Sequence, residues 1–194
     1  MLSRKIALAS VILLMAVPSA YANIVVNGGF ETGDFTGWTV SAGATGVTTA
    51  GFDGFNPHSG TYFANLGNVG CCGSLSQTFS TIAGQTLTLD YFLAADGGTP
   101  SHFEADWNGV AIAGSVLDNS ASSGYIEHTF NVVATGSDTL RFLERNDPGY
   151  WAFDDISLNV ASDRVPEPAS LAVLGGGLLA LGFSLRRRRA KQAV

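Results

Sequence analysis

The chain has 194 residues, 46% of them hydrophobic, and a formal net charge of −6 at pH 7. Between residues 23 and 162, however, 14 acidic residues stand against only two basic ones, so this segment carries a formal charge of −12. A segment with so few cations cannot neutralise phosphates, which excludes nucleic acid as its partner. Its acidic character suits solubility and the binding of divalent cations.

The first 22 residues have the pattern of a secretory signal peptide. Arg4 and Lys5 precede an apolar run from Ile6 to Val17, and an Ala-Tyr-Ala cleavage site follows at residues 20–22. Cleavage after this site would make Asn23 the mature N-terminus. An uncleaved anchor helix is the alternative, but the apolar run is short for a membrane span.

Residues 23–162 predict one all-β domain. Turn residues recur every eight to twelve positions, helical periodicity is absent, and several segments alternate apolar with polar residues. We expect strands near residues 38–40, 62–66, 74–79, 85–93, 102–107, 126–132, 140–142 and 150–160. Eight to ten short strands in one domain predict an antiparallel two-sheet sandwich of the jelly-roll type.

The two cysteines, Cys71 and Cys72, are adjacent and flanked by glycines. A disulfide between neighbours stores strain, because consecutive Cα atoms are about 3.8 Å apart, below the usual range for a disulfide. The flanking glycines would let the loop accommodate it. Intermolecular bridges and two free thiols are the alternatives, and the sequence leaves all three open.

The C-terminal part contains a second apolar segment. A linker at residues 163–168 ends in Pro-Glu-Pro, and residues 169–185 carry no charge. As a helix rising about 1.5 Å per residue, this stretch is a short but workable transmembrane segment. Residues 186–194 form a basic tail, which the positive-inside rule places in the cytoplasm.

Pro-Glu-Pro, an apolar stretch and an arginine cluster, in this order, resemble the PEP-CTERM sorting signal over residues 165–190. The resemblance implies recognition by an exosortase, a membrane protease-transpeptidase of Gram-negative bacteria that make exopolysaccharide. It implies passage through the inner membrane as a membrane-anchored precursor, removal of the tail, and transfer to the cell surface or extracellular matrix. The sorting residues are Pro166, Glu167, Pro168, Arg186, Arg187, Arg188 and Arg189.

Both ends of the domain, NGGFETGDFTGWTV and YWAFDDISLNV, resemble jelly-roll, galactose-binding-like carbohydrate-binding modules, as does GQTLTLDYFL in its centre. In those modules the two terminal motifs help to hold a structural calcium ion. The resemblance therefore implies a Ca²⁺ site with carboxylates from Glu31 and Asp154 and a carbonyl from Gly33. The full run is closer still to uncharacterised exported PEP-CTERM proteins, a likeness that implies no function.

The alternation of the last strand bears on this calcium site. Asp154 is in phase with Ile156 and Leu158, so we expect its side chain to point into the sandwich, and Asp155 to point the opposite way. A buried carboxylate without a partner is costly, and a hard cation would offset that cost. The alternative is that Asp154 caps a turn and accepts backbone N–H bonds.

Sugar recognition favours exposed aromatic rings beside amides and carboxylates. The candidate carbohydrate-binding residues are Trp107, Tyr125, Tyr150 and Trp151, with Asn108, Asp96 and Arg145 as polar neighbours. The alternative for each ring is ordinary burial in the core, the commonest fate of aromatic residues in a sandwich.

An enzyme is the least favoured interpretation. Glu104 and Asp106 share a strand face at roughly 6–7 Å, a separation that could suit glycoside hydrolysis, but the same pattern is typical of a solvated strand. The three histidines, His58, His102 and His128, have no metal-ligand spacing, and no hydrolase motif occurs. Three hypotheses follow: a non-catalytic matrix or surface protein that binds exopolysaccharide, a structural or adhesive matrix protein without a sugar site, and a polysaccharide-acting enzyme.

Overall fold

A computed structural model describes residues 23–41, 43, 45–70 and 72–161. The predicted signal peptide, the linker from residue 163, the predicted transmembrane segment, the basic tail and Cys71 lie outside these residues. In the part of the chain that is described, no helix has both the length and the apolar character needed to cross a membrane.

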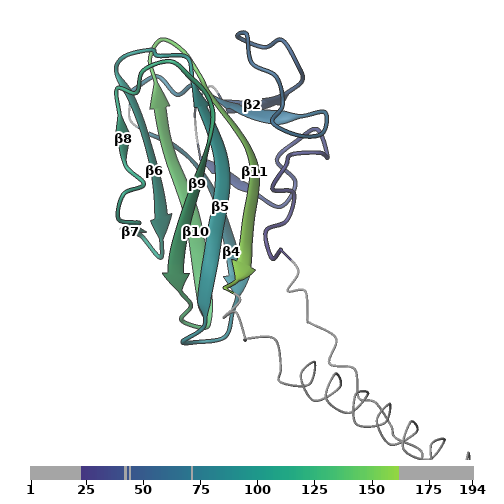
Figure 1. Cartoon of the computed structure of the whole chain (residues 1–194), viewed down its shortest axis with the longest axis vertical. Helices are drawn as coiled ribbons and strands as arrows, with labels where there is room; N and C mark the ends of the chain where they lie inside the picture. Colours follow the sequence, from purple (N-terminus) through teal and green to yellow (C-terminus); the bar gives the residue numbers. More distant parts are fainter. Residues whose placement is uncertain (1–22, 42, 44, 71, 162–194) are drawn as a thin grey trace, which may run out of the picture. The chain divides into compact units, whose positions relative to one another are not determined.

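The described chain forms two antiparallel sheets packed face to face (Figure 1), which confirms the predicted all-β sandwich. Within the described residues one sheet has six strands in the order β1-β4-β10-β6-β7, with β8 pairing to β6. These strands are β1 (Thr39–Ser41), β4 (Gly73–Ser80), β6 (Ser101–Trp107), β7 (Val110–Ala111), β8 (Leu117–Asp118) and β10 (Ser137–Asn146).

The other sheet has five strands in the described residues, in the order β2-β3-β11-β5-β9. They are β2 (Thr45–Thr48), β3 (Phe63–Leu66), β5 (Thr86–Ala95), β9 (Ser123–Val133) and β11 (Trp151–Val160). The first segment of the domain joins this sheet at its last strand, because Ile24 N–H donates to the Leu158 carbonyl at 3.0 Å. The chain therefore enters and leaves the sandwich at the same end.

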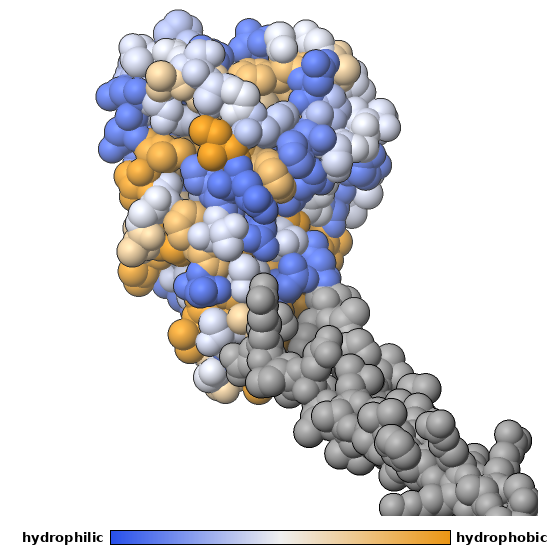
Figure 2. All heavy atoms as spheres, viewed as in Figure 1, coloured by the Kyte–Doolittle hydropathy of each residue, from blue (hydrophilic) through white to orange (hydrophobic). Residues whose placement is uncertain are grey.

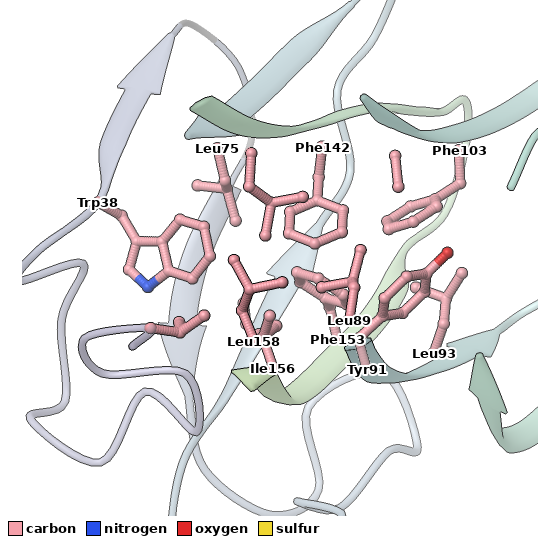
Figure 3. Close-up of a cluster of buried hydrophobic side chains, with 14 of the residues drawn as sticks. Trp38, Leu75, Leu89, Tyr91, Leu93, Phe103, Phe142, Phe153, Ile156 and Leu158 are labelled. Carbon is pink, nitrogen blue, oxygen red and sulfur yellow. The ribbon is translucent and has the colours of Figure 1, made fainter. Parts of the chain in front are cut away.

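The core lies between the two sheets and is rich in aromatic rings (Figure 3). Phe142 and Phe153, from opposite sheets, meet with ring centroids 4.7 Å apart. Tyr91 packs against both, at 5.3 and 5.6 Å. Such edge-to-face packing stabilises a core beyond the area that it buries.

On the surface, the face shown in Figure 2 carries hydrophobic residues in several groups separated by hydrophilic ones.

A β-bulge interrupts the last strand. Asp154 pairs with Phe92, but Ser157 pairs with Asp90, so one extra residue of β11 is accommodated between them. Asp155 takes a positive φ of 51° at this point. A bulge of this kind reverses the alternation of the strand, because side chains before and after it differ in phase.

The bulge makes the predicted orientation of Asp154 wrong. Asp154 shares the outer face of the five-stranded sheet with its partner Phe92, whereas Ile156 and Leu158 lie in the core. Asp154 is nevertheless fully buried. The reason is that the segment between β2 and β3 folds over this outer face and packs its Phe52 and Phe55 against a second apolar cluster.

Candidate functional site

A pocket of about 320 Å³ opens at the end of the sandwich that carries the loops 96–100, 119–122 and 147–150, here called the loop end. It lies between β9 and β8, the edge strands of the two sheets. Its inner wall is apolar and includes Leu93, Leu117 and Trp151. Its rim carries hydroxyl groups from Ser120, Ser122 and Ser123.

His128 adds a titratable group to the pocket wall. Its ring stacks on Tyr91 at 5.0 Å, and burial lowers the pKa of His128. The imidazole is therefore neutral at pH 7, and a neutral imidazole can both donate and accept a hydrogen bond. An apolar wall with a few polar groups at the rim is the usual construction of a small-ligand pocket.

Of the four aromatic residues predicted to contact sugar, Trp151 lines this pocket. Its indole N–H donates to the Arg145 carbonyl at 2.9 Å, which fixes the ring as part of the wall. Trp107 lies elsewhere, with 9% of its surface exposed and its indole N–H bonded to the Val133 carbonyl at 3.0 Å. Little of the Trp107 ring is available to a ligand.

Tyr125 and Tyr150 lie beside the segment that covers the outer face of the five-stranded sheet. Tyr150 packs against Phe52 with ring centroids 5.0 Å apart. Tyr125 joins the second apolar cluster, and its buried hydroxyl has no hydrogen-bond partner among the described residues. Burial, together with the nearby carboxylates of Asp154 and Asp155, raises the pKa of Tyr125. The structure thus distributes the four rings over three places.

The residues predicted to bind calcium gather around the loop at residues 58–62. The Asp154 carboxylate accepts N–H bonds from His58 at 2.9 Å and Ser59 at 3.3 Å. Glu31 accepts from Tyr62 N–H at 2.9 Å and from Thr61 N–H with both carboxylate oxygens. Burial, and next the neighbouring Asp155, raises the pKa of Asp154 to about 7.

Asp155 reaches the same loop as Asp154. Its carboxylate accepts from the Ser59 hydroxyl at 2.7 Å and contacts His58 Nδ1 at 2.7 Å. The prediction that the two aspartates point to opposite sides is therefore wrong, and the bulge is the physical reason. Gly33, the predicted carbonyl ligand, lies against the Tyr62 ring. In the described residues no three His, Cys, Asp or Glu side chains converge as a metal site, so a cation at Glu31 and Asp154 would also need backbone oxygens.

The carboxyl pair considered for catalysis lies on the outer face of the six-stranded sheet. The Asp106 carboxylate is 2% exposed and is covered by the Arg141 guanidinium, which donates to it from Nε at 2.9 Å. Hydrogen bonding to Asp106, then burial, raises the pKa of Glu104. A glycosidic bond cannot reach a carboxylate that is sealed by an arginine, so this pair has the geometry of a structural ion-pair cluster.

Sequence reasoning missed the pocket as a whole. His128 shares the apolar face of its strand with Ile126 and Phe130, a position that favours a core histidine over a binding residue. Sequence reasoning had no reason to select the serines at 120–123, which form a polar turn without a motif. Cys72 directly precedes β4 and is disulfide-bonded, which rules out a free thiol at this position, while Cys71 lies outside the described residues.

Residues 164–189 match the PEP-CTERM protein-sorting motif. The chain carries a PEP-CTERM sorting signal. This motif indicates export and surface sorting in a bacterium. No curated protein is similar enough to the chain to count as a relative.

The fold is similar to that of carbohydrate-binding modules. A family 61 module, TmCBM61, solved in complex with β-1,4-galactotriose, superimposes with a TM-score of 0.55 and 23% identity over 72% of this chain and 99% of the module. The enzymatically active domain of a tailspike protein from bacteriophage CBA120 gives a TM-score of 0.54 and 14% identity, over 71% of this chain and 21% of its own. A xylan-binding CBM22 domain from Paenibacillus barcinonensis gives 0.49 and 13%, over 70% and 92%. At identities below 25%, the first two likenesses, with TM-scores above 0.5, support the jelly-roll fold and nothing beyond the fold.

Proposed function

We propose that the sandwich is a non-catalytic domain that binds exopolysaccharide at the cell surface or in the extracellular matrix. The observation that carries this proposal is the pocket at the loop end, where the Trp151 ring forms an apolar wall and three serine hydroxyls form the rim. A sugar ring offers matching chemistry, because its C–H faces pack on apolar walls and its hydroxyls bond to polar groups.

The size of the pocket agrees with this proposal. Its volume of about 320 Å³ is at the lower end of the range of about 300–1,000 Å³ found for small-ligand sites. The neutral His128 side chain can donate a hydrogen bond to a sugar hydroxyl or accept one from it. The likeness to TmCBM61 supports a glycan as the ligand class and makes β-1,4-galactan a reasonable first probe.

Delivery of the domain belongs to the same proposal. After export through the inner membrane, the apolar segment at residues 169–185 would anchor the precursor while an exosortase recognises Pro166-Glu167-Pro168 and removes the tail. The domain would then act outside the cell, where polysaccharide is the abundant ligand.

Calcium at Glu31, Gly33 and Asp154 is also a proposal. It is supported by the complete burial of Asp154 and by the carboxylates of Asp155 and Glu31, which contact the same loop at residues 58–62. A hard cation would offset the cost of burying this charge. If it is bound, a chelator lowers the melting temperature of the wild-type chain by more than that of Asp154→Asn. A chelator effect of equal size in both proteins would contradict a site at Asp154.

Glycan binding is tested with the full-length chain, purified in detergent, against a panel of bacterial exopolysaccharides and β-1,4-galactan. Ser122 is exposed on the pocket rim, so Ser122→Trp fills the pocket without changing the core. We expect this variant to weaken binding at least about tenfold. Two variants are the matched controls. Ser122→Ala changes the same residue without adding bulk, and Ser80→Trp adds the same bulk at the end of β4 that lies away from the loop end.

Two results would contradict the proposal in different ways. Binding that Ser122→Trp leaves unchanged would place the glycan outside the pocket. Absence of binding to every glycan by the folded wild-type chain would favour a structural or adhesive matrix protein without a sugar site. Hydrolysis of a polysaccharide that is lost in Glu104→Gln would instead support an enzyme.

A further inference from the structure

Two loops at the loop end are joined by one carboxylate. Asp96 follows β5, and its Oδ1 accepts N–H bonds from Gly98 at 2.8 Å and from the Asn146 side-chain amide at 2.9 Å. Its Oδ2 accepts from Tyr150 N–H at 3.1 Å. The carboxylate therefore holds the loop 96–100 against the residues that connect β10 to β11.

Asn146 is buried beside this carboxylate with an unused acceptor. The residue is 1% exposed, and its Oδ1 has no hydrogen-bond partner among the described residues. Ser101, its register partner on β6, is 4% exposed and also has an unpartnered side-chain oxygen. Buried polar atoms in folded proteins nearly always have a partner, so two neighbouring acceptors of this kind point to a ligand that they bind.

Three oxygen atoms, from Asn146, Pro148 and Asp96, lie close together around Gly98. A Cβ at this residue would lie 2.5 Å from Asn146 Oδ1, 2.4 Å from the Pro148 carbonyl oxygen and 3.2 Å from Asp96 Oδ1. Three acceptors thus surround one glycine, and the residue can only be a glycine because a side chain would occupy their space. Turning the Asn146 amide over would not relieve the contact, since Oδ1 would then face the Asp96 carboxylate.

We propose that Asp96, Asn146 and the Pro148 carbonyl form a binding site for a hard divalent cation, Ca²⁺. Carboxylate, amide and carbonyl oxygens are the ligands that Ca²⁺ takes in proteins. The negative charge favours a cation over a water molecule, because the site includes the Asp96 carboxylate and lies in a segment of formal charge −12. A single carboxylate gives a weak site, with a dissociation constant of about 10⁻⁴–10⁻³ M, as in other extracellular modules.

This site is separate from the one expected at Glu31 and Asp154, and it does not depend on glycan binding. It uses one acidic side chain and neutral oxygens, a combination that is consistent with the lack of any group of three His, Cys, Asp or Glu side chains among the described residues. Its role is to hold the loops 96–100 and 147–150 together at the loop end.

The test is calorimetric titration of the full-length chain in detergent with CaCl₂, in the wild type, Asp96→Asn, Asn146→Asp and Asp147→Asn. Asp96→Asn removes the carboxylate, and we expect it to weaken this site at least about tenfold. Asn146→Asp adds a second carboxylate, and we expect it to tighten the site at least about tenfold. Asp147→Asn is the matched control, because Asp147 lies in the same loop but is paired with Arg145.

The result distinguishes a cation from a water molecule. Calcium affinity that is unchanged in both Asp96→Asn and Asn146→Asp would overturn the proposal and assign a water molecule to the three oxygens. If Asp96→Asn does not fold, Asn146→Asp decides alone: tighter binding supports the site, and unchanged or weaker binding overturns it. Glu31→Gln, titrated in the same way, leaves this site intact and so separates it from the other expected calcium site.

Discussion

At the residue scale, Gly28 lies where the first segment of the domain meets the β-bulge of β11. Ile156 N–H donates to the Gly28 carbonyl at 3.0 Å, and a Cβ at Gly28 would lie 2.0 Å from the Ile156 carbonyl oxygen. Two backbones can approach so closely only because glycine has no side chain. The NGGFE motif and the DDISL motif lie at opposite ends of the domain's sequence and meet in this one backbone contact.

We expect Gly28→Ala to lower the free energy of unfolding by about 3 kcal/mol, because the methyl group must displace backbone and break the bond to Ile156. Gly29→Ala is the control, since its Cβ would meet nothing closer than 3.3 Å. Denaturant unfolding of both variants measures the difference. Equal stability of the two variants would contradict the close contact at Gly28.

Two buried carboxylates have pKa values shifted in opposite directions. Burial raises the pKa of Glu144, and hydrogen bonds from Asn68 N–H and the Thr45 hydroxyl offset only part of this. Burial also acts on Asp138, but bonds from Thr81, Asn108 and Thr135 outweigh it and hold the pKa of Asp138 below its usual range.

The sign of the pH dependence follows for Glu144. The folded state binds the Glu144 proton more tightly than the unfolded state, in which the pKa of glutamate is about 4.3. The free energy of unfolding that Glu144 contributes is therefore lost as the pH rises from that value through the folded pKa. Relative to wild type, Glu144→Gln should therefore gain stability as the pH rises above the unfolded pKa of about 4.3. Asp138→Asn should not gain, because the Asp138 contribution is present above its unfolded pKa of about 3.9 and is lost only towards acid. Thermal melts at a series of pH values measure both trends, and parallel trends in the two variants would contradict the assignment.

Residue-scale prediction failed where the backbone left its regular path. The alternation of the last strand predicted Ile156 and Leu158 in the core, as observed, but extending the same phase back to Asp154 gave the wrong face. The positive φ of Asp155 has no clear local signal, because aspartate adopts it only when its surroundings hold it there. Glu31 and Asp154 are 123 positions apart in the chain, yet both accept N–H bonds from the loop at residues 58–62, a proximity that spacing in the sequence does not reveal.

At the element scale, the segment between β2 and β3 acts as a cover for the outer face of the five-stranded sheet. His58 connects it to the sheet twice: its ring stacks on Phe92 with centroids 3.7 Å apart, and its Nδ1 contacts Asp155 at 2.7 Å. The cover buries Phe63, Ala94 and Ala152, which otherwise would face solvent. One side chain thus links the loop, the sheet and the bulge.

We expect His58→Ala to release this cover locally without unfolding the sandwich. Amide hydrogen exchange of residues 49–62 should accelerate at least about tenfold, while exchange in β6 and β10 stays unchanged. His102→Ala is the matched control, since His102 Nδ1 also contacts a carboxylate at 2.7 Å, that of Asp118, but lies on the other sheet, on β6. Acceleration spread evenly over the whole domain would show that the cover and the sandwich unfold as one unit.

The strands that sequence predicted are those with regular alternation. β5 and β10 show it most clearly, because each has one face in the core and one outside. β2, β7 and β8 were not predicted: β2 is partly buried on both faces, and β7 and β8 have two residues each. Such short strands form because a partner strand is present, so their own residues carry little pattern. The pocket between β8 and β9 was missed for the same reason.

At the scale of the whole molecule, the sorting signal and the negative charge of the domain both suit a protein at the bacterial surface. A chain addressed to the bacterial surface carries 14 acidic and two basic residues between positions 23 and 162. Both arginines contact carboxylates, at Asp106 and Asp147, so they leave most of the acidic side chains without a cationic partner in the described residues. Self-repulsion of such a domain opposes its compact state, and salt screens this repulsion.

We therefore expect monovalent salt to stabilise the domain. Raising the salt concentration from about 0.01 M to about 0.5 M shortens the Debye length from about 30 Å to a few ångströms, and a gain of about 1 kcal/mol would raise the melting temperature by about 2–4 °C. Choline chloride and NaCl should act alike, because screening depends on ionic strength and not on the identity of the cation. CaCl₂ at matched ionic strength should stabilise further if either calcium site is real, and Asp96→Asn and Asp154→Asn each remove their own share of that excess. A melting temperature that is independent of monovalent salt would show that the acidic side chains lie too far apart to repel one another.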